Sequence, residues 1–365
     1  MNSYILLFLI IISSIIYTES QDYTISEIFK NDKHGNAIVE KLLRREGIKK
    51  DKNTDYTCGV YDNDYNIIAT ASCFGNTLRC LAIDHQHQGK GLVNKIFSHL
   101  IQYQYERNNF HLFLYTKPSV YHLFENLGFY EIVKIQEQIV FMENKKTGFN
   151  DYLNELSKTK KEGKKIASII MKVNPFTLGH LHLIEKASKE NDIVHIFIIS
   201  EDKLVFPFDI RKRLVMEGTE HLKNIIYHDS GPYIISSDTF PGYFQKDEYS
   251  VIESHANIDL EIFSKIAKSL GIKYRYFGEE NEIKEKEIYS KIMETKIPEY
   301  GINCIIVNKK KDSSGEIIST SKVRKLIKYK DFDKIKELVP ESIYKYLISP
   351  ESIEVIQKIK EFENI

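Results

Sequence analysis

The 365-residue sequence lacks a net charge, cysteine pairs and an apolar run of full transmembrane length. Lysine plus arginine and aspartate plus glutamate both total 51. No overall positive field therefore attracts nucleic acid, and any anion-binding site must be local. The four cysteines, Cys58, Cys73, Cys80 and Cys304, form no C-x-x-C pair and no metal-like cluster with histidine. This pattern predicts reduced thiols in the core or at the surface rather than a disulfide framework or a zinc site.

The N-terminal apolar segment, Tyr4–Tyr17, is short for a transmembrane helix and similar in length to the core of a signal peptide. No basic residue precedes it, so a signal peptide, a peripheral anchor and a non-native start all stay open as interpretations. We expect residues 1–20 to be dispensable for catalysis. We expect the protein to be cytoplasmic, and a stable membrane association is doubtful.

Two series of alternating strands and helices follow, separated by a stretch dense in lysine and glutamate. The second series predicts parallel βαβ units with ligands at the carboxyl ends of the strands. Its expected strands are 166–171, 193–200, 224–228, 274–277 and 304–307, and its expected helices are 179–190, 208–221 and 260–270. We therefore expect an apolar segment (1–20), an α+β domain (21–148), a charged linker (149–165), a domain with a mostly parallel sheet (166–348) and a C-terminal tail (349–365).

The first chemical motif is a glycine-rich turn between an expected strand, 77–83, and an expected helix. It spans Gln86 to Gly91 and has the spacing Q-x-x-G-x-G. Gly89 and Gly91 allow the backbone to approach a pyrophosphate, and the free N–H groups of the following helix point towards it. A turn of this kind is also common as a purely structural feature. A second segment, FENLGFYEI (124–132), strengthens the functional interpretation.

Together the two segments resemble the GNAT family of acyl-CoA-dependent acetyltransferases. The resemblance implies that Gln86, Gly89 and Gly91 bind the pyrophosphate of coenzyme A or of a similar carrier. Many family members have a tyrosine four residues before the glycine of LGF, where it protonates a departing thiolate. This sequence has Phe124 there, as expected if the thiol is the acceptor and no thiolate departs.

The second motif, Thr177-Leu178-Gly179-His180, follows the expected strand 166–171 and begins a helix. It matches the T/H-x-G-H signature of the nucleotidyltransferase superfamily. We expect His180 to stabilise charge on phosphate oxygens, with Thr177 beside it in catalysis. Asn174, Phe176 and Gly179 are expected to line the nucleotide. Alone, a histidine at a helix start is more often structural.

Two later segments support the nucleotide site. Ser319, Thr320 and Ser321 lead into a basic helix that carries Arg324 one turn later. Hydroxyls and free N–H groups there would form a second phosphate cradle, although a plain serine N-cap is the alternative. Between the two motifs, Gly278-Glu279 ends an expected strand, where glycine lets the backbone contact an adenine.

The combination of both halves resembles the citrate lyase ligase family over about residues 22–355, in stretches such as CFGNTLRCLA, NPFTLGH and DSGPYIIS. The resemblance implies a GNAT-like domain followed by a Rossmann-like nucleotidyltransferase domain. It also implies an ATP- and Mg²⁺-dependent ligase that transfers acetate, through acetyl-adenylate, to the thiol of a dephospho-CoA-derived group on the acyl-carrier subunit of citrate lyase. Two alternatives remain: an acetyl-CoA-dependent acetyltransferase with a degenerate second domain, and a non-catalytic assembly factor.

Overall fold

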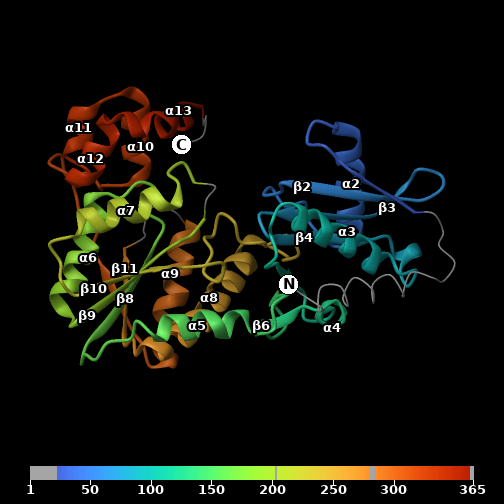
Figure 1. Ribbon diagram of the computed structural model, residues 1–365, viewed down its shortest axis with the longest axis horizontal. Helices are drawn as coiled ribbons and strands as arrows, with labels where there is room; N and C mark the ends of the chain where they lie inside the picture. Colours follow the sequence, from blue (N-terminus) through green and yellow to red (C-terminus); the bar gives the residue numbers. More distant parts are fainter. Residues whose placement is uncertain (1–22, 202–203, 280–283, 362–365) are drawn as a thin grey trace. The chain divides into compact units, whose positions relative to one another are not determined.

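The computed structural model describes residues 23–201, 204–279 and 284–361, and it divides the chain into two compact units (Figure 1). Unit 1 contains the N-terminal residues up to Lys146 together with a short later segment, Pro241–Lys246. Unit 2 contains Thr147–Phe240 and the chain from Asp247 onward. The apolar segment Tyr4–Tyr17 lies outside the described residues. Within the described ones, no helix combines the length and apolar character needed to cross a membrane.

Unit 1 is a seven-stranded, mostly antiparallel sheet in the order β1-β2-β3-β4-β5-β7-β6. Its elements are β1 (Thr24–Glu27), α2 (Lys33–Arg45), β2 (Tyr56–Tyr61), β3 (Ile67–Phe74), β4 (Thr77–Ile83), η1 (His85–His87), α3 (Leu92–Glu106), β5 (Phe113–Thr116), α4 (Tyr121–Glu125), β6 (Tyr130–Ile135) and β7 (Ile139–Glu143). Neighbouring residues of β4 face different cores: Leu81 packs against the core that includes α3, and Ala82 belongs to the core that includes α2. Because side chains alternate along a strand, α2 and α3 cover opposite faces of the sheet.

The segment Pro241–Lys246, which we call the strap, completes the α2 face of unit 1. Tyr243 is 9% exposed and packs in the same core as Ile28, Val39 and Cys80. The carbonyl of Tyr243 accepts a hydrogen bond of 2.7 Å from the backbone N–H of Lys49. A segment that follows β10 in sequence therefore supplies a core residue to the N-terminal unit.

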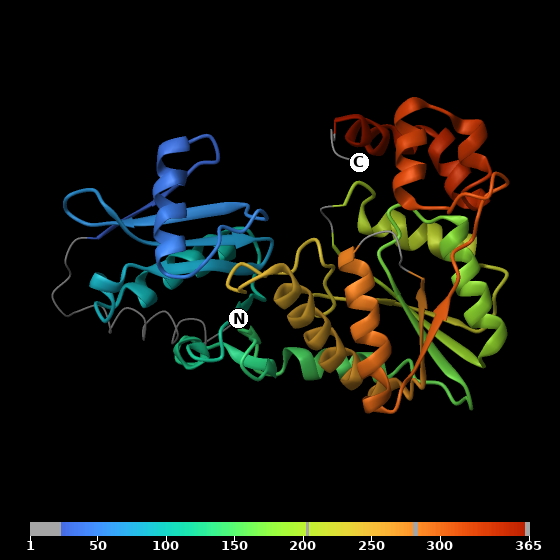
Figure 2. The same ribbon diagram turned by 180° about the vertical axis from the view of Figure 1, so that it is seen from behind.

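Unit 2 is built on a five-stranded parallel sheet in the order β10-β9-β8-β11-β12, so both expected fold classes are confirmed. Its elements are α5 (Gly148–Ser157), β8 (Ile166–Met171), α6 (Leu178–Glu190), β9 (Ile193–Ile198), α7 (Phe208–Gly218), β10 (Ile225–Asp229), α8 (Glu248–Leu270), β11 (Tyr274–Gly278), α9 (Lys284–Lys296), η2 (Ile297–Tyr300), β12 (Asn303–Val307), α10 (Thr320–Tyr329), α11 (Phe332–Lys336), α12 (Glu341–Ile348), η3 (Pro350–Ser352) and α13 (Ile353–Glu361). The chain order along the sheet reverses at β8, and parallel sheets bind ligands outside the strand ends at such a point. The C-terminal helices, drawn in red, gather at one end of the unit in both views (Figure 1 and Figure 2).

Two segments differ from the expected domain limits. The first part of the stretch expected as a charged linker, up to Ser157, forms α5, which begins unit 2 and buries Phe149 and Leu156. The stretch expected as a tail forms α13, whose Val355 and Ile359 belong to the core of unit 2. In both helices, a few apolar residues on one face are enough for packing, although many of the other residues are polar or charged.

A buried histidine pair joins β9 and β10. The Nδ1 atom of His195 lies 2.8 Å from the Nε2 atom of His228, and the two side chains are almost inaccessible to solvent. Burial lowers the pKa of His195 to about 4 and the pKa of His228 to about 3, with smaller contributions from nearby positive charge. Both rings are therefore neutral at neutral pH.

This pair predicts an acid-sensitive unit 2. The unfolded chain binds protons at each histidine near pH 6.5, whereas the folded chain keeps both rings neutral to lower pH. The contribution to the free energy of unfolding is therefore complete above pH 6.5 and falls as the pH drops towards 4, by up to on the order of 3 kcal/mol per histidine. Urea unfolding at pH 7, 6 and 5 measures this slope. The double variant His195→Leu/His228→Leu should flatten it, and an unchanged slope would contradict the assignment.

Candidate active site

The cavity of unit 1 lies where β4 and β5 separate. These parallel strands pair only at Thr77–Phe113 and Leu78–Leu114. A bulge then follows in β4 at Cys80, whose φ is +51°. Beyond it, a cavity of about 530 Å³ opens between the strands and is lined by residues of both, including Leu81, Ala82, Tyr115 and Thr116. Because Leu81 and Ala82 face opposite sides of the sheet, the cavity runs through the sheet from the α3 face to the α2 face.

The glycine-rich turn lies at the α3 end of this cavity. Gly89 and Gly91 both line it and have φ values of +76° and +72°, which favour glycine. Apart from the adjacent residues, no atom of the described chain lies within 4 Å of a Cβ built on either one, and no described side chain caps α3. The turn therefore has the open space that an approaching anion would need. Gln86, in contrast, does not line the cavity, whereas His87 and Gln88 do.

His87 is a residue that the motif treats as a spacer. Its Nδ1 atom is buried and has no hydrogen-bond partner among the residues that the structure describes. A buried imidazole nitrogen is costly to leave without a partner, so a ligand in the cavity could satisfy it. The sequence shows a histidine inside the Q-x-x-G spacing, but the sequence alone does not distinguish a ligand-binding histidine there from an exposed one.

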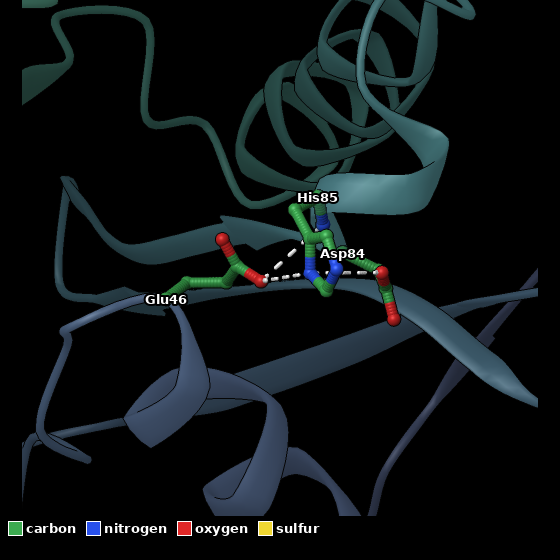
Figure 3. Close-up of side chains that lie close together, drawn as sticks. All are labelled: Glu46, Asp84 and His85. Atoms are coloured by element: carbon green, nitrogen blue, oxygen red, sulfur yellow. Dashed lines mark hydrogen bonds and ion pairs between the residues drawn. The ribbon is translucent and has the colours of Figure 1, made fainter.

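A charged cluster holds the start of this turn (Figure 3). Glu46, Asp84 and His85 bring one potential metal-ligand atom each within 4.8 Å of one another. However, an Asp84 oxygen accepts a hydrogen bond from the backbone N–H of Gln86, and Arg45 pairs with both carboxylates. Since each carboxylate already has a cation beside it, we interpret this cluster as an anchor for the turn.

Aromatic side chains contribute to the other walls of the cavity, beside aliphatic ones. Phe124 is 8% exposed, packs 5.3 Å from the ring of Phe97 and lines the cavity at the position where the resemblance had suggested a tyrosine. On the α2 side, Tyr243 and Phe244 of the strap line the same cavity. The strap residues lie far from both unit 1 motifs in sequence, so only the structure could assign them to this site.

In unit 2, His180 is fixed at the start of α6 by the residue that caps the helix. The backbone N–H of Thr177 donates a hydrogen bond of 3.1 Å to Nδ1 of His180, and Thr177 Oγ1 accepts one from the backbone N–H of His180. Because a backbone N–H can only donate, Nδ1 must be unprotonated and Nε2 carries the proton. Burial, assisted by the charge of Lys286, lowers the pKa of His180 to about 4. The ring is thus a neutral donor with Nε2–H turned away from its anchor.

The remaining residues of the loop before α6 support this histidine. Phe176 is 1% exposed, and its ring stacks on His180 with 6.0 Å between centroids. The structure therefore places its side chain beneath His180, in the core. Asn174 accepts a hydrogen bond through its side chain from the backbone N–H of Phe206, 3.1 Å away. The loop after β8 is therefore held in place by a contact with the loop after β9.

The start of α10 lies beside the start of α6. A Cβ built on Gly179 would lie 3.3 Å from the carbonyl oxygen of Ile318, the residue before the expected hydroxyl run. Ser319 caps α10 by accepting a hydrogen bond from the backbone N–H of Lys322, and its hydroxyl lies 3.1 Å from that of Ser321. Two helix N-termini and their partial positive charges therefore meet here.

Arg324 ties the two helix starts together. It donates a hydrogen bond of 2.6 Å to the carbonyl of Asn174. Thr320, the first residue of α10, is partly buried. Gly278 ends β11, and a Cβ built on it would meet no atom of the described residues within 4 Å. The backbone N–H of Glu279 donates a hydrogen bond to the carbonyl of Val307. All predicted nucleotide residues thus belong to the strand ends and helix starts at one edge of the parallel sheet.

Arg211 organises the same edge from inside the core of unit 2. It is 1% exposed. Its guanidinium donates hydrogen bonds of 2.7–3.0 Å to four backbone carbonyls, those of Lys172, Ile199, Glu201 and Phe206. These carbonyls belong to the segments that follow β8 and β9. Arg211 is therefore a positioning residue for the loops at the strand ends.

Arg211→Met should lower the free energy of unfolding by about 3–5 kcal/mol, because buried carbonyls lose their donors. Arg213→Met is a matched control, since Arg213 pairs with Glu351 at a half-exposed position and its loss should cost within about 1 kcal/mol. Urea unfolding of both variants measures the difference. Equal stability of the two variants would show that the carbonyl contacts are unimportant.

The two units define a class of protein before any comparison. A sheet opened by separated parallel strands, with a glycine turn at its mouth, is suited to a long carrier arm with a pyrophosphate. A parallel sheet with a neutral histidine donor at its edge is suited to nucleotide phosphates. Both features in one chain define an enzyme that combines nucleotide chemistry with acyl-group chemistry.

Comparison with known proteins gives the family. A family model described as the citrate lyase ligase C-terminal domain matches residues 166–347. The chain is 34% identical over 316 residues to the [citrate [pro-3S]-lyase] ligase of Haemophilus influenzae, covering 85% of this chain and 94% of the relative. It is 33% identical over 336 residues to the Escherichia coli K12 protein of the same name, covering 86% and 94%. The chain therefore belongs to the citrate lyase ligase family and is an enzyme of the ligase class.

Proposed function

We propose that this enzyme uses ATP and acetate to acetylate the thiol of a dephospho-CoA-derived prosthetic group on the acyl-carrier subunit of citrate lyase. The observation that carries the proposal is the Thr177–His180 arrangement, which leaves a neutral Nε2–H donor between two helix N-termini. An acetyltransferase that relied on acetyl-CoA would need no such donor, and neither would an assembly factor. Since ATP and citrate lyase are cytoplasmic components, we also propose a cytoplasmic location.

Unit 2 carries out the first step in this proposal. An acetate oxygen attacks the α-phosphorus of ATP, pyrophosphate leaves, and acetyl-adenylate forms. Negative charge grows on the phosphate oxygens during this step. His180 would donate a hydrogen bond to one of them through Nε2, while the N–H groups at the starts of α6 and α10 add positive potential. Arg324 would act by holding the loop at Asn174 in place.

Mg²⁺ would enter with ATP and neutralise the leaving pyrophosphate. Among the described residues, one group of three potential metal ligands lies within 4.8 Å, Glu46, Asp84 and His85, and it belongs to unit 1. The phosphates of ATP therefore supply the ligands for this ion in the proposal, and no step depends on a protein-bound metal.

Unit 1 carries out the second step. Gly89 and Gly91 would bind the pyrophosphate of the prosthetic arm at the α3 end of the cavity, and the arm would extend through the sheet. The thiol sulfur then attacks the acetyl carbon, and AMP leaves. AMP needs little help from an acid, which agrees with the apolar Phe124 in the wall.

Pyrophosphate release tests the proposal. With ATP and acetate, the purified enzyme should release pyrophosphate, and deacetylated citrate lyase should convert this into continuous turnover with acetyl transfer to the lyase. Acetyl transfer from acetyl-CoA without ATP would instead indicate the acetyltransferase alternative. Lyase binding without either reaction would indicate the assembly factor.

A further inference from the structure

A basic groove adjoins the cavity of unit 1 on its α2 side. Its volume is about 850 Å³, large enough for a nucleotide. Four cationic residues line it, Arg44, Lys49, Lys117 and Lys246, together with one described carboxylate, Glu137. The cations come from separate parts of unit 1: the end of α2, the loop after it, the residue after β5, and the strap. Their convergence gives the groove a positive potential.

Lys117 lies where the groove and the cavity meet. Ile48, Lys117 and Phe244 line both spaces, so the two lie side by side. The ammonium of Lys117 lies over Gly47, 3.8 Å from where a Cβ would stand, and its side chain is partly buried. Lys117 and Lys246 form no ion pair with any residue in the described part of the chain. Their charges are available to a ligand.

The direction of the carrier arm decides what the groove binds. The thiol must be free to take the acetyl group, so the arm is attached to its carrier on the other side of the pyrophosphate. If the pyrophosphate lies at Gly91, on the α3 side, the carrier stays outside that end and the thiol points to the α2 side. The groove therefore faces the thiol and not the carrier protein.

We propose that this groove is the acyl-donor site, which binds the phosphate of the acyl-adenylate during transfer and the phosphate of AMP afterwards; this rests on the function proposed above. The thiol sulfur bonds to the acetyl carbon, and the bond from that carbon to the phosphate oxygen breaks. The oxygen keeps the electron pair, and the thiol proton passes to water. AMP gains a negative charge in this step, and Lys117 and Lys246 stabilise it.

The strap relates this site to the adenylating unit. In unit 2, Thr239 and Ser236 donate hydrogen bonds of 2.7–2.8 Å to the carboxylate of Glu201, which follows β9. A few residues later the chain enters unit 1 as the strap and places Phe244 and Lys246 in the groove. The segment that lines the donor site is thus a direct continuation of a loop anchored at the strand ends where the adenylate forms.

The test supplies synthetic acetyl-adenylate and free dephospho-CoA to the full-length enzyme, which bypasses both adenylation and the carrier protein. Lys117→Gln and Lys246→Gln should each slow thioester formation roughly 10–100-fold, as expected for one lost contact to a charged group. Lys41→Gln, an exposed residue of α2 outside the groove, should leave it unchanged. AMP should inhibit transfer by the wild type more strongly than transfer by the groove variants.

Each other outcome has a separate meaning. If both groove variants transfer acetyl to dephospho-CoA at the wild-type rate but need more carrier protein, the groove binds an acidic surface of the carrier and the donor-site proposal is overturned. Wild-type behaviour with both acceptors would overturn it as well. If the wild type makes no adenylate from ATP and acetate yet uses synthetic adenylate, the proposed adenylation fails while the donor site stands.

Discussion

Replacing His180 with alanine is expected to slow acetate-dependent pyrophosphate release by ~10²–10³-fold, the usual loss for one oriented donor to a transition-state oxygen. The reason is the fixed tautomer. Thr177 binds Nδ1 through a backbone N–H, so the proton sits on Nε2 and no rearrangement is needed during reaction. Because burial lowers the pKa of His180 to about 4, the donor stays neutral from pH 8 to about pH 5, and this residue should add no pH dependence to adenylation in that range.

Two further variants distinguish the loss of the hydrogen-bond donor at His180 from a general disturbance of α6. His180→Gln offers an amide N–H near the position of Nε2 and should retain part of the rate. His182→Ala removes another partly buried imidazole from the same helix and serves as the control. Rapid-quench measurement of adenylate formation, with thermal unfolding of each variant, gives the comparison. Equal rates for His180→Ala and His182→Ala would refute the role.

The second large effect is expected from Gly91→Val, which should abolish acetyl transfer to the lyase while adenylate formation continues. A valine side chain would fill the open space beside the turn that a pyrophosphate needs, and φ of +72° is unfavourable for a β-branched residue. We expect transfer to fall at least ~100-fold, as for loss of a well-placed phosphate contact. Carrier acetylation and pyrophosphate release are measured on the same sample.

Gly75→Val controls for the backbone strain. Gly75 also has a positive φ, +56°, and open space around it, but it lies outside the cavity. It should lose stability in a similar way and keep its transfer activity. If both valine variants lost adenylation and transfer equally at normal thermal stability, the two steps would not be assigned to separate units.

Local patterns predicted the strands of unit 2 well. Parallel strands buried on both faces are short apolar runs, and Ile166–Met171 begins and ends where the sequence indicates. The capped turns at Thr177 and Ser319 were also readable, because a hydroxyl followed by an apolar helix face is a local signal. Cys58, Cys73, Cys80 and Cys304 are free thiols, as their spacing predicted.

The features that the sequence did not predict share a physical cause. They involve polar side chains that are buried because residues far away in the sequence bind them. Helix α8 begins at Glu248, well before the expected Leu260, because its first half buries polar residues that hide the apolar period. Asp259, for example, is 7% exposed and accepts a 2.8 Å hydrogen bond from Arg275 on β11. The burial of Arg211 also depends on distant partners. Nothing in an arginine's neighbours along the chain shows that four carbonyls surround it.

The strap also affects when unit 1 can finish folding during translation. The strands of unit 1 have all been synthesised once Glu143 is made, but Tyr243 is synthesised only after β8, β9 and β10. Until then the core around Ile28 and Val39 lacks one of its members. N-terminal domains usually fold first during translation. In this protein, however, Tyr243 of the unit 1 cavity is synthesised after three strands of the unit 2 sheet. The nascent chain therefore cannot complete the wall of the unit 1 cavity before β8, β9 and β10 of unit 2 have been synthesised.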